Sequence, residues 1–350
     1  MQKDHLQYLR CPTTGNTLSV ENAVLESGRI KSGTLLDASG EHRYPIVGFI
    51  PRFVSPDNYC KSFSIEWKHH CKTLHQTYSG HDFVRTRYYK ETRWGSDLKG
   101  ELLLELGCGS GCLTTHALET GAMVVSFDYS TGVEANYAAN GQHPNLLIVQ
   151  ANIFQMPFPK RLFDKAYCFG VLQHTPDPKA ALMAMVQMVK PGGKLASDIY
   201  AYDPRDGMLR SKYLLRPLAT KMSPETLYNL VYWYVNCTWW FSRLVEKIPR
   251  IGWRINRNLL LDHHFCQQMP GASQQYLKEV NYQNIFDLLS PAYDYPQTLE
   301  TFKAWHTEAG LKDIDVCRGY NGIEGHASVA VQINSNHLPG PQNPTISKAA

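Results

Sequence analysis

The sequence predicts an α/β protein whose main domain is built on a parallel β-sheet. Apolar runs alternate with helical segments between residues 101 and 203. The first run, "ELLLEL" at 101–106, is almost continuously apolar, as a strand buried on both faces requires. A turn with three glycines in five positions follows it, where the strand gives way to a helix. This alternation indicates strand–helix–strand crossovers and therefore parallel pairing.

Two units are expected before this domain. Residues 1–55 favour a small β module, because "GTLLDASGEHRYPIVGFIPRFV" has short apolar stretches broken by glycine and proline, as hairpins have. Residues 56–100 are aromatic and basic, with "SFSIEWKHH" and "RYYKETRWG", and are expected to form helices that lead into the main domain.

The main domain is expected to span 101–203 and 296–334. A helical cap insertion at 204–295 interrupts it, and a polar, proline-rich tail at 335–350 is expected to be disordered. The expected strands are 101–106, 122–128, 145–151, 164–170, 194–202, 312–320 and 327–333, and the expected helices are 112–121, 132–140, 178–190 and 298–310.

Composition restricts the class of protein. The 350 residues exceed what one ordinary core needs, and 43% hydrophobic with 19% charged residues is typical of a globular protein. A net charge of +4 is too small to require a nucleic-acid partner. Nine scattered cysteines favour reduced thiols and a cytoplasmic location. The beginning of the chain has no apolar core of signal-peptide length, and no run matches a membrane span.

The glycine-rich turn indicates a ligand site. Gly107, Gly109 and Gly111 remove side chains where a ligand approaches the backbone, and the next helix offers free N–H groups. A dinucleotide loop requires a third glycine at the position of Cys112, so the spacing does not favour NAD. Glu105 adds negative charge beside the turn, which suits a cationic ligand, and Asp128 at the end of the second strand can accept ribose hydroxyls.

At this point the chain resembles the class I S-adenosylmethionine-dependent methyltransferases. The motifs are "ELGCGSG", "SFDYS", "NIFQMPF", "FGVLQHTPDP" and "VKPGGKL", in order, within about residues 100–203 and 296–333. The resemblance implies a Rossmann-like seven-stranded sheet with a final antiparallel hairpin, and S-adenosyl-L-methionine as cofactor. The cofactor-binding residues that it implies are Glu105, Gly107, Cys108, Gly109, Gly111, Asp128, Tyr129, Asn152, Ile153 and Phe169.

The parts of the cofactor are assigned by the same resemblance. Glu105 and the three glycines surround the methionine, Asp128 holds the ribose, and Tyr129 lies near the adenine. Asn152 stands where the family usually has aspartate; asparagine keeps an acceptor oxygen, so Asn152 stays an adenine neighbour beside Ile153.

The reacting end is less well determined by the sequence. His174 in "GVLQHTPDP" is the best candidate for a general base, because imidazole titrates near neutral pH; the alternative is that it braces its loop. The carboxylates of metal-dependent relatives are replaced by Gly170 and Gln173, so no catalytic metal is expected. The cluster "LDHHFC", with His263, His264 and Cys266, is not expected to bind metal either. The pair His69–His70 is expected to lie on a solvated helix face.

The N-terminal module resembles the zinc-ribbon-like activator domain found with some RNA and protein methyltransferases. "LRCPTTGNTL" and "YPIVGFIPRF" carry the resemblance, but Thr14 replaces the second cysteine of the usual C-P-x-C pattern, so we expect a metal-free module. In the insertion, "TLYNLVYWYVNCTWWFSRLVEKI" is strongly aromatic. A buried cap helix is the favoured interpretation, and an amphipathic surface that contacts a membrane or a lipid-linked acceptor is the alternative.

The sequence therefore predicts a cytoplasmic methyltransferase that O-methylates a small molecule, a sugar or a lipid-linked intermediate. An RNA methyltransferase is the main alternative, suggested by the activator-like module and by the basic segments "RSKYLLRPLATK" and "RIGWRINR" of the insertion. A non-enzymatic cofactor-binding protein and a nicotinamide oxidoreductase are weaker alternatives. The oligomeric state is not determined.

Overall fold

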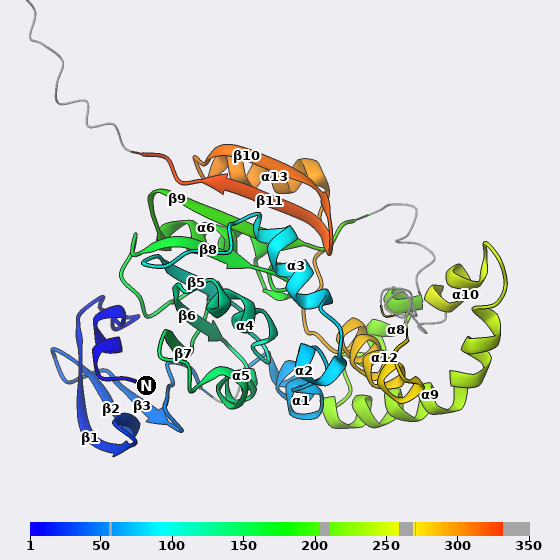
Figure 1. Ribbon diagram of the computed structural model, residues 1–350, viewed down its shortest axis with the longest axis horizontal. Helices are drawn as coiled ribbons and strands as arrows, with labels where there is room; N and C mark the ends of the chain where they lie inside the picture. The colour runs from blue at the N-terminus through cyan, green and yellow to red at the C-terminus, as the bar shows by residue number, and fades with distance from the viewer. Residues whose placement is uncertain (56–57, 203–210, 259–268, 270, 332–350) are drawn as a thin grey trace, which may run out of the picture.

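A seven-stranded sheet forms the centre of the molecule in the computed structural model, which describes residues 1–55, 58–202, 211–258, 269 and 271–331 (Figure 1). The strand order is β10-β11-β9-β8-β5-β6-β7. Neighbours from β9 to β7 pair in parallel, whereas β11 is antiparallel to both β9 and β10. The predicted α/β fold, with its parallel sheet and final antiparallel hairpin, is confirmed.

The strands of this sheet follow the apolar runs of the sequence. Every position of β5 and β7 is buried, because helices cover both faces of the sheet. The strands are β5 Leu102–Leu106, β6 Met123–Asp128, β7 Leu146–Gln150, β8 Phe163–Cys168, β9 Val189–Ile199, β10 Lys312–Gly319 and β11 Gly322–Ser328.

Two hydrophobic cores lie on opposite faces of the sheet. One contains Tyr88, Leu118 and Val133, from the helices α3, α4 and α5. The other contains Leu182 and Phe302, from α6 and α13. The helices are α3 Phe83–Thr92, α4 Cys112–Glu119, α5 Gly132–Asn140, α6 Pro178–Met188 and α13 Leu299–Glu308.

The N-terminal residues form a separate four-stranded antiparallel sheet, as the hairpin pattern predicts. It lies beside β7, where the main-chain N–H of Phe53 donates to the carbonyl of Gln150 at 2.8 Å, and the Arg52 guanidinium donates to the Gln150 side chain at 3.0 Å. The elements are the 3₁₀ helix η1 Asp4–Tyr8 and the strands β1 Leu18–Glu26, β2 Arg29–Asp37, β3 Arg43–Val47 and β4 Ile50–Pro51.

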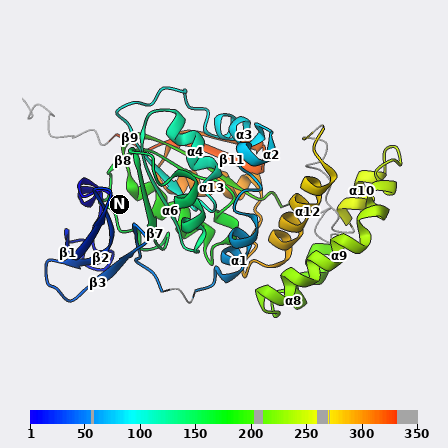
Figure 2. The same cartoon turned by 60° about the horizontal axis from the view of Figure 1, so that its bottom comes forward.

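Helices occupy the two remaining segments. The lead-in contains α1 Lys61–His70 and α2 Gln76–Ser79 before α3. The insertion contains α8 Ser211–Ala219, α9 Pro224–Val245, α10 Gly252–Asn258 and α12 Gln274–Leu289. We call α8, α9 and α10 the helical arm. The arm and the N-terminal sheet lie at opposite ends of the central domain in both views (Figures 1 and 2).

Three expectations about elements are corrected. The helix expected over 178–190 ends at Met188, and Pro191, Gly192 and Gly193 belong to β9 rather than to a turn. Glycine and proline are tolerated there because β9 changes register between its pairings with Phe163 and Lys165. The last strand is Gly322–Ser328 rather than 327–333, because a two-residue turn at Tyr320 and Asn321 joins it directly to β10.

The aromatic helix expected as a buried cap is the third correction. α9 buries one face, which includes Val231, Val235 and Trp239, against α12 and its surroundings. Its other face is exposed, with Trp233 at 62% and Trp240 at 64% of full exposure. The tail at 335–350 lies outside the described residues.

Candidate functional site

A cavity of about 530 Å³ opens where β5, β6 and β8 end. The carboxyl ends of parallel strands are the usual ligand position in such sheets. Helices α1, α8 and α12 contribute the outer wall. The sequence-predicted site residues that line the cavity are Gly107, Cys108, Gly109, Asp128, Tyr129, Ile153, Phe169 and His174.

The glycine turn after β5 is closely packed by other elements. Gly107 has φ +75°, and a Cβ there would lie 2.3 Å from Cγ2 of Val171. Gly109 has φ +50°, and a Cβ there would lie 2.7 Å from Cζ2 of Trp67. Both positions therefore require glycine for backbone conformation and for space. Gly107 and Gly109 both line the cavity.

Asp128 connects this turn to the end of β6. Its Oδ2 accepts from the N–H of Gly109 at 2.9 Å, and its Oδ1 accepts from the N–H and the hydroxyl of Ser130, each at 2.7 Å. Burial raises the pKa of the Asp128 carboxyl, and these hydrogen bonds oppose the rise. The carboxylate borders the cavity and has lone pairs left to accept from a ligand.

Glu105 does not line the cavity. It is buried beneath the turn, where its Oε2 accepts from the hydroxyls of Thr114 and Ser126. Asn136 donates to both of those hydroxyls, at 3.0 and 3.1 Å, and so links α5 to the same network. Burial raises the pKa of Glu105 to about 7, so the carboxyl is partly neutral near physiological pH.

Gly111 and Asn152 are also absent from the cavity lining. Gly111 is the N-cap of α4 with φ +82°, and its carbonyl accepts from the amide of Asn140 at 2.9 Å. The Oδ1 of Asn152 accepts from the N–H of Phe154 at 3.0 Å, which stabilises the turn after β7. The structure therefore uses both residues to shape the loops that border the cavity.

His174 ends the short 3₁₀ helix η2 Leu172–His174 and is buried. Its Nδ1 lies 3.0 Å from the carbonyl oxygen of Tyr293, which can only accept, so Nδ1 carries the proton. Its Nε2 has no hydrogen-bond partner in the described chain. Phe63 and Tyr200 contact the ring edge-on, each with centroids 5.4 Å away. This arrangement leaves Nε2 without a partner on a residue that lines the cavity.

The sequence did not predict the residues that form the outer wall of the cavity. Tyr59, Phe63 and Trp67 come from the lead-in, and Tyr213 and Asp287 come from the insertion. The aromatic content of 56–100 was the available signal, but nothing in the sequence shows that this segment returns to the glycine turn. Glu66 is also in this wall; its Oε1 accepts from Gln283 of α12 at 2.9 Å, and burial raises its pKa well above the usual range.

A buried ion-pair network also borders the cavity. Arg87 of α3 donates to Glu91 at 2.9 Å and to Asp198 of β9 at 3.0 Å, and Asn321 donates to the same oxygen of Asp198 at 3.0 Å. Burial raises the pKa of Asp198, and the charge of Arg87 opposes the rise. The network holds α3 against the carboxyl end of β9.

The histidine and cysteine clusters of the sequence have different outcomes. His69–His70 was expected to be a solvated helix face, but His70 is buried, with Nε2 3.1 Å from the hydroxyl of Tyr228. Burial, together with the neighbouring His69, lowers the pKa of His70 to about 4. The segment with His263, His264 and Cys266 lies outside the described residues.

No helix that the structure describes combines the length and the apolar character needed to cross a membrane.

Comparisons with known proteins identify a methyltransferase domain in the segment that contains the glycine turn and several strands of the central sheet. A family model described as a methyltransferase domain matches residues 104–197. A demethylmenaquinone methyltransferase of Corynebacterium glutamicum is 30% identical over 174 residues, 47% of this chain and 73% of the relative. A ubiquinone biosynthesis O-methyltransferase of Coxiella burnetii is 32% identical over 114 residues, 32% of this chain and 47% of that protein.

Solved structures are similar at a coarser level. Human N-acetylserotonin methyltransferase in complex with SAM is 12% identical, with a TM-score of 0.38, over 78% of this chain and 57% of that one.

Proposed function

Because the chain belongs to the S-adenosylmethionine-dependent methyltransferases, we propose that its central cavity holds this cofactor beside a small-molecule methyl acceptor. One observation supports the proposal most: Asp128, Gly109 and His174 border the same cavity, and Nε2 of His174 has no hydrogen-bond partner among the described residues. Such a cavity can hold the nucleoside of the cofactor at one end and present a general base to the methyl acceptor at the other. A volume of about 530 Å³ is within the range of small-molecule sites.

The cofactor end of the proposed site is the glycine turn. The main-chain groups of Gly107 and Gly109 contact the methionine, Asp128 accepts the ribose hydroxyls, and Tyr129 and Ile153 border the adenine. Cys108 and Phe169 also line the cavity. Glu105, Gly111 and Asn152 act indirectly, because their side chains or carbonyls hold the loops from outside the cavity.

At the acceptor end, His174 is proposed to receive a proton. The bound cofactor supplies an activated methyl group for an in-line displacement. The carbonyl of Tyr293 fixes the ring with Nδ1 protonated, so that Nε2 can accept the proton of an acceptor hydroxyl. Phe63 and Tyr200 hold the ring from its edges and exclude water around it.

The acceptor is proposed to be a phenolic or quinone-precursor ring with a hydroxyl group. The aromatic side chains of Phe63 and Tyr200 pack beside His174, and Tyr59 and Tyr213 line the same cavity, which suits a flat apolar ring. The names of two relatives, which refer to demethylmenaquinone and to ubiquinone biosynthesis, support the same class. O-methylation is favoured because it needs the base that His174 supplies.

The proposal is tested by transfer from labelled cofactor. The purified enzyme is incubated with S-adenosylmethionine carrying a labelled methyl group and a cell extract, which is then separated into polar metabolite, lipid and RNA fractions. Label is expected in the lipid fraction. The Asp128→Ala variant serves as the control for background transfer. Label confined to RNA would favour the RNA methyltransferase instead.

The cofactor assignment has a direct test at Asp128. Replacement by alanine removes the acceptor of two ribose hydroxyls, so cofactor binding should weaken by about 1–3 kcal/mol. Calorimetric titration with S-adenosylhomocysteine measures the change. Asp97→Ala, a change of another aspartate outside the cavity lining, is the matched control and should bind normally. Equal affinities of the two variants would contradict the assigned role.

The helical arm is proposed to contact an anionic membrane surface that carries the acceptor. Helix α8 connects the cavity with the exposed apolar surface of the arm. Its Lys212 and Tyr213 line the cavity, while Leu214 and Leu218 are exposed. Residues 211–258 contain eight lysines and arginines but only two glutamates, which complements anionic headgroups. A lipid-soluble acceptor could then pass from the bilayer along α8.

The proposed location is the cytoplasmic side of such a membrane. Among the residues that the structure describes, all eight cysteines are free thiols, which suits a reducing compartment.

A further inference from the structure

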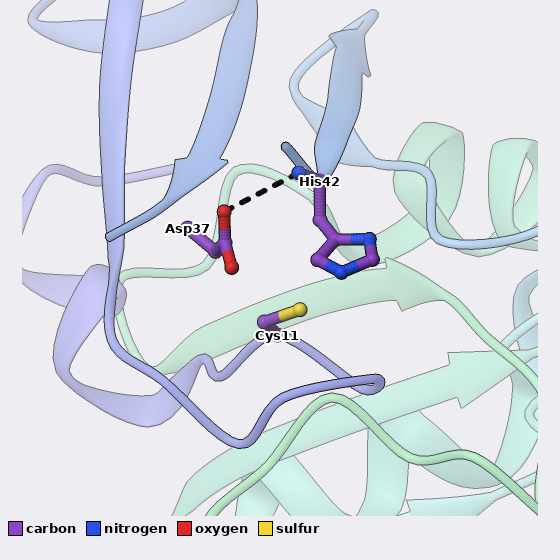
Figure 3. Close-up of side chains that lie close together, drawn as sticks. All are labelled: Cys11, Asp37 and His42. Carbon is purple, nitrogen blue, oxygen red and sulfur yellow. Dashed lines mark hydrogen bonds between the residues drawn. The ribbon is translucent and has the colours of Figure 1, made fainter. Parts of the chain in front are cut away.

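Three potential metal ligands meet in the N-terminal sheet (Figure 3). Cys11 follows η1, Asp37 ends β2, and His42 immediately precedes β3. The thiol sulfur, a carboxylate oxygen and a ring nitrogen of these residues all lie within 4.8 Å of one another. Thiolate, imidazole and carboxylate are the three donor types that hold Zn²⁺ in proteins.

The expectation of a metal-free module rested on Thr14, which stands where a second cysteine is usual. The fold brings in two other donors from the β2–β3 hairpin, which are distant from Cys11 in the sequence. Cys11 and Asp37 are both buried, whereas the His42 ring is half-exposed and reachable from solvent. Within the described residues, the His42 ring nitrogens have no hydrogen-bond partner.

Neighbouring groups orient two of the three donors. The N–H of Thr14 donates to Sγ of Cys11 at 3.4 Å, and the Tyr44 hydroxyl lies 3.3 Å from the same sulfur. The hydroxyl of Ser39 donates to Asp37 at 2.8 Å. Donors placed around a thiolate and a carboxylate in this way are typical of the outer shell of a metal site, where they fix the ligands in position.

We propose that Cys11, Asp37 and His42 bind one zinc ion, with water as the fourth ligand. Zinc bonds of about 2.0–2.3 Å in a tetrahedron place ligand atoms about 3.5 Å apart, so donors that lie within 4.8 Å of one another must close by at most about 1.3 Å. The half-exposed His42 ring can rotate to do so. A soft thiolate with imidazole favours Zn²⁺ over Mg²⁺ or Ca²⁺.

The ion would stabilise the contact between the N-terminal sheet and the central domain. It ties the segment after η1 to the β2–β3 hairpin. In the same segment, the N–H of Arg10 donates to the carbonyl of Pro157 at 2.8 Å, beside the loop that follows β7. Zinc is therefore assigned a structural role at a distance from the methyl-transfer cavity, whose lining includes none of the three ligands.

Metal titration of the full-length protein tests the proposal. Chelator-treated protein is titrated with Zn²⁺ against a chromophoric indicator, and one ion per chain is expected. His42→Ala should weaken binding at least about 100-fold, because ligand loss exceeds the 10–100-fold cost of outer-shell changes. Co²⁺ should give a sulfur-to-metal absorption band that Cys11→Ser removes. Cys237→Ser, at an exposed cysteine of α9, is the control and should retain both signals.

Two further measurements distinguish this site from zinc binding elsewhere in the chain and from misfolding of the variant. His263→Ala/His264→Ala should leave zinc binding unchanged; loss of binding in that variant, with retention in His42→Ala, would place the metal elsewhere. Zn²⁺ should raise the melting temperature of the wild type but not of His42→Ala. If the metal-free His42→Ala variant has the same melting temperature as the metal-free wild type, misfolding does not explain its weaker zinc binding. An absence of zinc binding by the wild type would overturn the proposal.

Discussion

At the scale of single residues, the buried carboxyl of Glu105 makes stability depend on pH. Burial raises its pKa from 4.5 to about 7 in the folded chain. Between these values the folded state keeps a proton that the unfolded state has lost, so stability falls as pH rises from about 4.5 to about 7. The full loss at Glu105 is about 3–4 kcal/mol. Urea unfolding of the wild type and Glu105→Gln, from pH 5 to pH 8, measures it.

Glutamine keeps the acceptor for Thr114 and Ser126 but cannot ionise. The advantage of Glu105→Gln over the wild type should therefore grow with pH and level off above about 7. Other titrating groups are common to both proteins and cancel in the difference. A constant difference across the range would show that Glu105 has an ordinary pKa in the folded chain.

The same residue shows what the motif could and could not predict. The sequence identified the turn and its residues, because glycine spacing and an acidic residue at a strand end are local features. It could not show that Glu105 points below the turn toward Thr114 and Asn136, since those contacts depend on how α4 and α5 pack. Nor could it show that Trp67 packs on Gly109, because the two come from different elements.

At the scale of elements, α1 and the glycine turn are packed so closely that neither can change alone. Alanine at Gly109 adopts a left-handed backbone, which costs about 1 kcal/mol, and its Cβ meets the Trp67 ring. Such overpacking costs about 1–3 kcal/mol more. Gly109→Ala should therefore lower the free energy of unfolding by about 2–4 kcal/mol and also weaken cofactor binding. Denaturant unfolding and calorimetry measure the two effects.

Gly100→Ala is the matched control. Gly100 has φ +81°, but no atom lies within 4 Å of a Cβ built there, so only the backbone cost of about 1 kcal/mol applies. Cofactor binding should not change in this variant. If both variants lost the same stability, the contact between Trp67 and the turn would have no energetic consequence.

Where β9 begins and where β11 lies are decided by strand pairing, which local sequence patterns do not reveal. Pro191 and Gly192 are typical of a turn, yet the N–H of Gly192 donates to Val329 at 2.8 Å and continues the sheet. The final strand contains Glu324 and His326, which made it look polar. Pairing with β9 decides its position, and Arg93 and the carbonyl of Glu91 provide polar partners for these two side chains.

At the scale of the whole molecule, the sequence predicted the order of the units but not their arrangement. The lead-in and the insertion are separated by more than a hundred residues, yet α1 packs on α12 and both border the cavity. Hydrophobic periodicity shows which face of a helix is apolar but not which partner covers it. For α9 it could not show that part of its aromatic surface, with Trp233 and Trp240, is mostly exposed among the described residues.

That uncovered surface leads to a prediction about membranes. The protein should bind vesicles that contain anionic lipid more strongly than neutral vesicles, and salt should weaken the binding. Trp233→Ser and Trp240→Ser should each weaken it about tenfold, because about 1.4 kcal/mol of apolar burial corresponds to that factor. Co-sedimentation with vesicles measures the bound fraction for each variant.

Leu25→Ser provides a control at the opposite end of the molecule. Leu25 lies in the N-terminal sheet and is 62% exposed, the same fraction as Trp233, so it matches the substitution in exposure but not in location. Its vesicle binding should equal that of the wild type. Equal losses from Leu25→Ser and Trp233→Ser would mean that apolar exposure in general drives binding, and that the helical arm has no special part in it. Binding that is indifferent to lipid charge would likewise exclude the role given to the arm's basic residues.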